Sequence, residues 1–178
     1  MLDQAKTQLM IIDVQGTLAQ IMHQRESLFS NLNSLTRAAI LMDLPIVWVE
    51  QIPDKLGPTI QEIASELPDR KAMAKSSFSA WGESSVRDSI DSNKKQILLV
   101  GIEAHICVHQ TAMDLLAQGF EVHLVTDAIS SRTAENKALA IQRLAREGAT
   151  LTSTEMALFE LQKVAEGDQF RALLALIK

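Results

Sequence analysis

Cysteine is almost absent from the sequence, because Cys107 is the only one among 178 residues. A single cysteine cannot form a disulfide within the chain, which agrees with a reducing compartment. The N-terminus has no charged start followed by an apolar block, and no apolar run approaches the length that spans a bilayer. We therefore expect a cytoplasmic protein without a membrane partner.

An excess of basic charge is also missing. The chain has 17 Lys and Arg residues against 22 Asp and Glu, a net charge of −5, and the two signs are interspersed. Nucleic-acid binding calls for a basic stripe, so this composition argues against a nucleic-acid partner. A Gly-rich dinucleotide fingerprint and a phosphate-binding P-loop are both absent, so nucleotide binding has no support.

Short apolar runs alternate with segments of helical periodicity along the chain. Strands that alternate with helices form parallel βαβ units with helices on both faces of the sheet. A hydrophobic fraction of 47% suits a doubly covered sheet, and 178 residues fit one domain. The sequence therefore predicts an α/β protein, a Rossmann-like three-layer α/β/α sandwich with a central, mostly parallel sheet, in a single domain over residues 1–178. The main expected strands are 8–14, 46–49, 97–100, 121–126 and 149–151, and expected helices include 27–42, 86–90, 134–147 and 168–178.

The stretch from Gln96 to Thr111, QILLVGIEAHICVHQT, contains the lone thiol. Its apolar run predicts a buried strand that ends near Val100, and helical spacing from Cys107 onward predicts a helix. Ligands of open α/β sheets bind at such a junction, where unpaired N–H groups of the helix start favour a thiolate. Cys107 is therefore a candidate nucleophile of lowered pKa. Position alone leaves a second interpretation open, a small buried hydrophobe.

Two charged residues can meet this thiol. Asp13 lies near the end of the apolar run QLMIIDV, so its carboxylate falls at the carboxyl end of a predicted first strand. Lys75 joins the same sheet edge if residues 71–75 form a strand or approach that edge. A thiol, a carboxylate that takes its proton and an ammonium that holds the thiolate are what nucleophilic attack on a carbonyl requires. A turn aspartate and a solvated lysine are the structural alternatives.

Three motifs in this chain resemble those of the isochorismatase-like cysteine hydrolases. They are MIIDVQ with Asp13, AKSSFSAW with Lys75, and GIEAHICVHQTAMDLLAQGFEVHLVTDA with Cys107. The stretch 50–59, EQIPDKLGPT, is similar to that of the isochorismatase-domain-containing subgroup. The resemblance implies a hydrolase in which Asp13 acts as base, Lys75 stabilises the thiolate, and Cys107 attacks a small amide or related carbonyl to form a thioester.

The resemblance also implies the surroundings of the nucleophile. A cis peptide is expected at Ile102–Glu103, and the backbone N–H groups of Glu103 and Cys107 are expected to form the oxyanion hole. The residues expected to line the substrate pocket are Gln15, Gln51 and Phe78.

No metal is expected at this site. Nicotinamidases of the same superfamily hold a metal with an Asp-x-His pair after the second strand, where this chain has Glu50 and Gln51. His105 and His109 have the four-residue spacing of a zinc pair, but no third ligand is in sight. The resemblance therefore implies an enzyme without a cofactor that acts on a small-molecule substrate.

Two other functions remain open from the sequence. One is a catalytically silent binding or interaction protein that keeps the fold. The other is a redox-sensing thiol protein, because a low thiol pKa also invites oxidation. A homo-oligomer is expected in each case, because the family commonly assembles and the apolar tail 170–177 has residues to bury.

Overall fold

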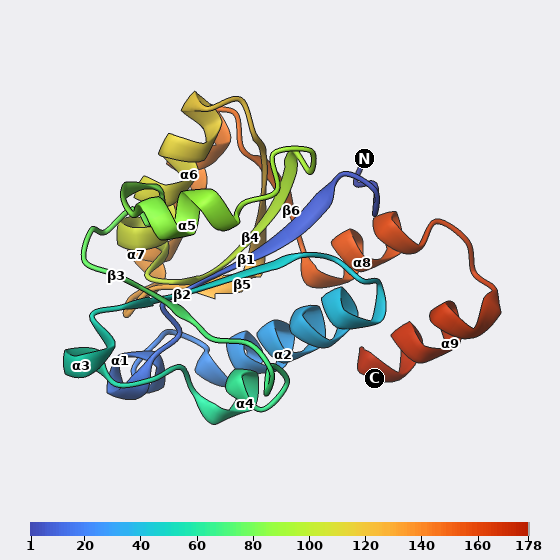
Figure 1. The fold of residues 1–178 in the computed structure, drawn as a ribbon, viewed down its shortest axis with the longest axis horizontal. Helices are drawn as coiled ribbons and strands as arrows, with labels where there is room; N and C mark the ends of the chain where they lie inside the picture. Colours follow the sequence, from blue (N-terminus) through green and yellow to red (C-terminus); the bar gives the residue numbers. More distant parts are fainter. Residues whose placement is uncertain (178) are drawn as a thin grey trace.

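The computed structural model describes residues 1–177 and contains a six-stranded parallel sheet covered by helices on both faces (Figure 1). The strand order is β3-β2-β1-β4-β5-β6, and every neighbouring pair is parallel. The predicted three-layer α/β/α fold is confirmed. The strands are β1 (Thr7–Ile12), β2 (Ile46–Gln51), β3 (Met73–Lys75), β4 (Gln96–Ile102), β5 (Glu121–Ser130) and β6 (Thr150–Thr152).

Each face of the sheet has its own hydrophobic core. Along β1, Leu9 and Ile11 point into one core, while Met10 and Ile12 point into the other. This alternation explains why the central strands are continuous apolar runs, since both faces are covered. On the lower face in Figure 1 lie α1 (Gly16–Gln20), α2 (Arg25–Leu41), α4 (Gln61–Ala64), α8 (Thr154–Gln162) and α9 (Gly167–Leu176). On the upper face lie α5 (Ser84–Ser89), α6 (His109–Ala117) and α7 (Ala134–Arg146).

The turn after β4 differs from the sequence prediction. A π-helical turn, η2 (Ala104–Val108), comes between β4 and α6, so Cys107 lies inside this turn instead of starting a regular helix. The strand β5 is also longer than expected and contains Asp127. The Asp127 carboxylate accepts hydrogen bonds from the N–H and hydroxyl of Thr154, at 2.8 and 2.9 Å, at the start of α8.

The apolar C-terminal tail packs against other helices of the same chain. Leu173 of α9 is fully buried, and the Phe170 ring packs 6.4 Å from the Phe159 ring of α8. The predicted tail extends to Lys178, which lies outside the described residues. Because α9 packs on α2 and α8, part of its apolar surface is buried within the chain.

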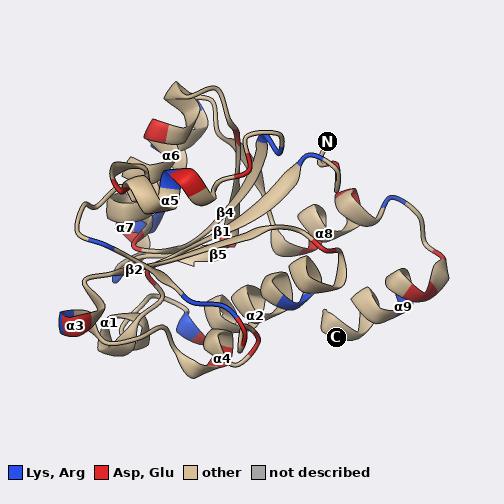
Figure 2. Cartoon of the chain, in the orientation of Figure 1, with Lys and Arg blue, Asp and Glu red and all other residues tan. Residues whose placement is uncertain are grey.

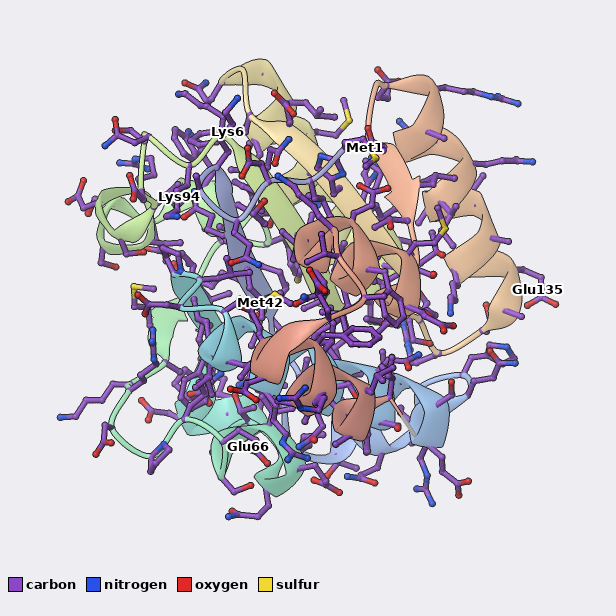
Figure 3. The ribbon with its side chains drawn as sticks, turned by 90° about the vertical axis from the view of Figure 1, so that its right-hand side faces the viewer. Met1, Lys6, Met42, Glu66, Lys94 and Glu135 are labelled. Carbon is purple, nitrogen blue, oxygen red and sulfur yellow. The ribbon has the colours of Figure 1, made fainter. Side chains whose placement is uncertain are left out.

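Lys and Arg are interspersed with Asp and Glu over the ribbon (Figure 2). The strands' amino ends lie at the edge that faces the viewer in Figure 3, near the labelled Met1, Lys6 and Lys94. The carboxyl ends lie at the opposite edge, beside α1 and the short helix α3 (Pro53–Leu56) in Figure 1. No helix within residues 1–177 is both long and apolar enough to cross a membrane.

A close approach between β4 and β1 depends on Gly101. Its φ is +116°, and a Cβ atom added there would lie 2.1 Å from the Ile12 carbonyl oxygen. Ile12 directly precedes Asp13, so this contact fixes the relative positions of the two central strand ends.

We expect Gly101→Ala to lower the free energy of unfolding by about 3 kcal/mol or more, through backbone strain and overlap together. Gly148→Ala is the matched control, because Gly148 also has a positive φ, +103°, but no atom within 4 Å of an added Cβ. In Gly148→Ala, backbone strain alone should lower the free energy of unfolding, by about 1–2 kcal/mol. Urea unfolding of both variants tests this, and equal losses would contradict the role of the close approach.

Candidate active site

Asp13 follows β1 directly and is held in the left-handed backbone region, with φ at 51°. Its N–H donates to the Val49 carbonyl oxygen at 3.2 Å, and its side chain is only 3% exposed. The Oδ2 atom lies 2.7 Å from the Lys75 ammonium. Apart from this ammonium and the Cys107 thiol, no donor within the described part of the chain is placed to satisfy the carboxylate oxygens.

Lys75 is the last residue of β3, which is separated from β1 by β2. Its side chain must therefore cross β2, a span of about two strand spacings of roughly 4.8 Å each. Gln51 at the end of β2 pairs in register with Lys75, and its Oε1 accepts from Nζ at 2.5 Å. The carbonyl oxygens of Ser77 and Phe78 accept from the same ammonium at 3.1 and 3.0 Å. This set of oxygens holds the ammonium against Asp13.

Two residues that were predicted to line the substrate pocket, Gln15 and Gln51, have hydrogen-bond partners within the protein that support this arrangement. Gln15 is fully buried, donates to the Gly57 carbonyl oxygen at 2.7 Å and accepts the Gln51 N–H at 2.7 Å. The Gln51 amide donates to the Ser76 carbonyl oxygen at 2.8 Å while it accepts from Lys75. Their polar atoms are engaged within the protein because they fix the lysine. The third predicted residue, Phe78, has a ring on the surface, with the residue 56% exposed.

Cys107 is 8% exposed and interacts with both members of the ion pair. Burial raises the pKa of the thiol to about 12, the negative charge of Asp13 adds to the rise, and Lys75 opposes it. Burial also raises the pKa of Asp13, again against the effect of Lys75. The expected low thiol pKa is therefore wrong for this resting structure. The cause is the buried position in the π-helical turn, where desolvation outweighs the favourable charge.

The turn that carries the thiol begins at the Ile102–Glu103 peptide, which is cis, at the bond that the resemblance indicates. The Glu103 carbonyl oxygen accepts the N–H groups of Ile106 and Val108 at 3.0 and 3.2 Å. The Glu103 side chain is buried and pairs with Arg132, at 3.2 Å between Oε2 and Nε. Sequence reasoning did not identify Arg132 as a site residue. Its position just after β5, at the carboxyl edge of the sheet, could have indicated that it lies near the site.

His105 in the turn and His109 at the start of α6 lie in different surroundings. His105 Nδ1 lies 2.9 Å from the Ser131 hydroxyl, whereas burial and Arg143 lower the pKa of His109, and Glu147 opposes this. Within residues 1–177, no group of three or more His, Cys, Asp or Glu side chains is arranged to hold a metal ion.

The fold and this site define an α/β protein with a buried carboxylate, ammonium and thiol together at the carboxyl edge of a parallel sheet. The family model for the isochorismatase domain matches residues 7–156. The chain therefore belongs to the isochorismatase family.

Individual proteins agree with this assignment. The chain is 37% identical to the secreted isochorismatase effector Isc1 of Phytophthora sojae, with 96% of this chain and 83% of that protein covered. It is 36% identical to isochorismatase domain-containing protein 2 of Danio rerio, with coverage of 95% and 85%. The YcaC gene product of Escherichia coli, described as an octameric hydrolase of unknown specificity, has the same fold. Its TM-score is 0.92 at 22% identity, with 98% of this chain and 89% of that chain covered.

The raised thiol pKa predicts how Cys107 reacts with iodoacetamide. Alkylation should be slow at pH 7 and keep rising toward pH 12, beyond the ordinary thiol pKa of about 8.5, because the thiol stays protonated. Asp13→Asn should speed alkylation at pH 7, since it removes a charge that disfavours the thiolate, and Lys75→Met should slow it.

Mass spectrometry over a pH series measures these rates, with Cys107→Ser as the background because the chain has no other thiol. An alkylation rate that reaches a plateau near pH 8.5 would contradict the raised pKa of Cys107. Slower alkylation in Asp13→Asn would contradict the effect of Asp13 on that pKa.

Proposed function

We propose that this protein is a metal-independent cysteine hydrolase that cleaves a small amide or related carbonyl compound through a thioester on Cys107. The observation that carries the proposal is the buried Asp13–Lys75 ion pair next to the single thiol. A buried charge pair is costly to desolvate, so its position beside a potential nucleophile favours a chemical role. The isochorismatase-family hydrolase fold supports the same class of activity.

The proposed first step uses the resting thiol. As Cys107 Sγ attacks the carbonyl carbon, Asp13 accepts the thiol proton, and Lys75 balances the negative charge that passes to the sulfur. The carbonyl electrons move to the oxygen, which the backbone N–H groups of Glu103 and Cys107 would stabilise. Asp13 then gives its proton to the leaving nitrogen, and the C–N bond breaks.

Hydrolysis of the thioester completes the cycle. A water molecule attacks the thioester carbonyl while Asp13 accepts its proton, and the C–S bond breaks to release the acid. The proton returns from Asp13 to Cys107, so both groups recover their starting states. A carboxyl with a pKa raised by burial suits this exchange, because its carboxylate accepts a proton more readily than that of an ordinary aspartate.

The surroundings of Asp13 support a mechanism without a metal. Glu50 accepts hydrogen bonds from the Thr59 N–H and hydroxyl, both at 2.7 Å, and Gln51 holds Lys75. The two residues that stand in place of an Asp-x-His pair are thus engaged within the protein. A redox-sensing role has less support, because a buried thiol of raised pKa is a poor target for oxidation.

The acyl-transfer step can be tested with p-nitrophenyl acetate and a panel of small primary amides. We expect Cys107→Ala and Asp13→Asn to lower kcat by about a thousandfold or more, because nucleophile and base act as a unit. Asp54→Asn, at an exposed site on α3, is the matched control and should keep parent activity.

Intact-mass analysis should detect one acetyl group in the parent protein and none in Cys107→Ala. Parent-level turnover in Cys107→Ala, or acetylation that persists in it, would contradict the proposal.

We also propose that the protein is a homo-oligomer in the cytoplasm. A groove of about 450 Å³ between α2 and α9 exposes apolar side chains, and the E. coli protein of the same fold is described as octameric. The groove is lined mainly by Ile40, Leu41, Ala172, Ala175 and Leu176.

The single cysteine agrees with a reducing compartment, although the Phytophthora relative is described as secreted.

Gel filtration with light scattering at micromolar concentration should give a mass that is a multiple of 19.6 kDa. Ile40→Lys in the groove should lower that mass, because it places a charge in an apolar interface. A parent protein of monomer mass would contradict assembly.

A further inference from the structure

The turn that carries Cys107 is held at two points by the segment after β5. The Glu103 Oε2 atom accepts two hydrogen bonds from Arg132, from its backbone N–H at 3.1 Å and from Nε at 3.2 Å. One residue earlier in the same segment, the Ser131 hydroxyl lies 2.9 Å from His105 Nδ1. The adjacent residues Ser131 and Arg132 thus contact His105 and Glu103 of the turn. Cys107 lies two positions after His105.

We propose that Glu103 and Arg132 are positioning residues, whose ion pair fixes the turn 103–107 in the geometry required for acyl transfer. This proposal rests on the function proposed above, because the turn contains the nucleophile and both expected oxyanion donors. The pair acts through the backbone and makes no contact with the reacting atoms. It is called the turn clamp below.

Burial makes the turn clamp specific. The Glu103 residue is only 6% exposed, so its carboxylate requires the two donors that Arg132 supplies. The backbone carbonyl of Glu103 accepts the N–H groups that form the π-helical turn. The side chain and main chain of one residue therefore connect the segment after β5 to the turn that holds the thiol.

The segment that holds the turn is itself anchored. Ser130 pairs with Ile102 across the sheet, and its hydroxyl donates to the His23 carbonyl oxygen at 2.7 Å. The His23 N–H donates in return to the Ser131 carbonyl oxygen at 2.9 Å. Arg132 therefore extends from a fixed segment, which can hold a neighbouring turn in one position.

A precise turn matters because misplacement of a nucleophile by about 1 Å can lower the rate a hundredfold. The Arg132 side chain is 54% exposed, so an alternative is that its guanidinium contacts the substrate directly. The two roles differ in kinetics. A positioning residue affects kcat, whereas a residue that binds substrate equally in the ground and transition states affects KM.

The test compares Arg132→Ala, Arg132→Lys, Glu103→Gln and the control Arg146→Ala, an exposed arginine at the end of α7. With p-nitrophenyl acetate, Arg132→Ala should lower kcat by about ten- to hundredfold and change KM by less than about twofold. Glu103→Gln removes the charge of the pair but keeps an acceptor oxygen, so it should lower kcat in the same direction as Arg132→Ala and by less. Combined with Arg132→Ala, it should add no further loss, since the two residues act as a unit.

Alkylation of Cys107 by iodoacetamide gives a second readout that requires no turnover. Loosening the turn should expose the buried thiol, so Arg132→Ala should alkylate faster at a fixed pH while its kcat falls. A general loss of folding would instead lower the urea midpoint of unfolding, which is measured on each variant. If Arg132→Ala does not fold, Arg132→Lys, which lacks the Nε donor, should show smaller changes in the same directions.

The outcomes separate the two proposals. Unchanged kcat and alkylation in Arg132→Ala, with acetylation of the parent protein, would overturn the turn clamp and leave the proposed function intact. A higher KM at unchanged kcat would also overturn the turn clamp, because Arg132 would then contact substrate. Faster alkylation in Arg132→Ala alone, with no acetylation of the parent, would support the turn clamp as a structural device and overturn the proposed function.

Discussion

The buried ion pair between Asp13 and Lys75 is the interaction on which the rest of the candidate site depends. Two opposite charges that are removed from water stabilise each other. Removal of one partner leaves an unpaired buried charge and lowers the free energy of unfolding by about 3–5 kcal/mol. The lysine comes from a strand two positions away in the sheet, so Gln51 and two backbone carbonyls must hold it in place. Gln15 in turn fixes Gln51. One electrostatic requirement thus joins three distant segments of the chain.

The parallel sheet supplies the positions that this pair needs. All six strands point the same way, so residues that follow β1, β3, β4 and β5 meet at one edge. The central strands β1 and β4 approach closely at Gly101, which brings the segment of Asp13 beside the turn of Cys107. The loops at this edge add hydrogen bonds that the strands cannot provide. Sheet topology therefore sets which residues meet, and loop contacts set their orientation.

Burial gives the thiol a resting state that differs from that of an exposed reactive cysteine. The raised pKa of Cys107 keeps its proton in place at neutral pH, with a buried carboxylate nearby to receive it. In the proposed mechanism the thiolate develops only as a carbonyl carbon approaches, because proton transfer and attack occur together. Such a site limits side reactions of the sulfur. It also makes the rate sensitive to the position of the turn, which is where the proposed turn clamp acts.

Local patterns in the sequence are enough to predict the fold class and the residues at the sheet edge. Apolar runs reveal strands buried on both faces, and the end of each run identifies the edge, so Asp13 and Cys107 could be located without coordinates. Three features depend on the folded chain and could not be predicted. They are the reach of Lys75 over β2, the hydrogen bonds of Gln15 and Gln51, and the ion pair between Glu103 and Arg132. The same holds for the thiol pKa, which helix-start reasoning predicted to be low. The physical reason is that desolvation and side-chain hydrogen bonds depend on neighbours distant in sequence, whereas strand and helix patterns are local.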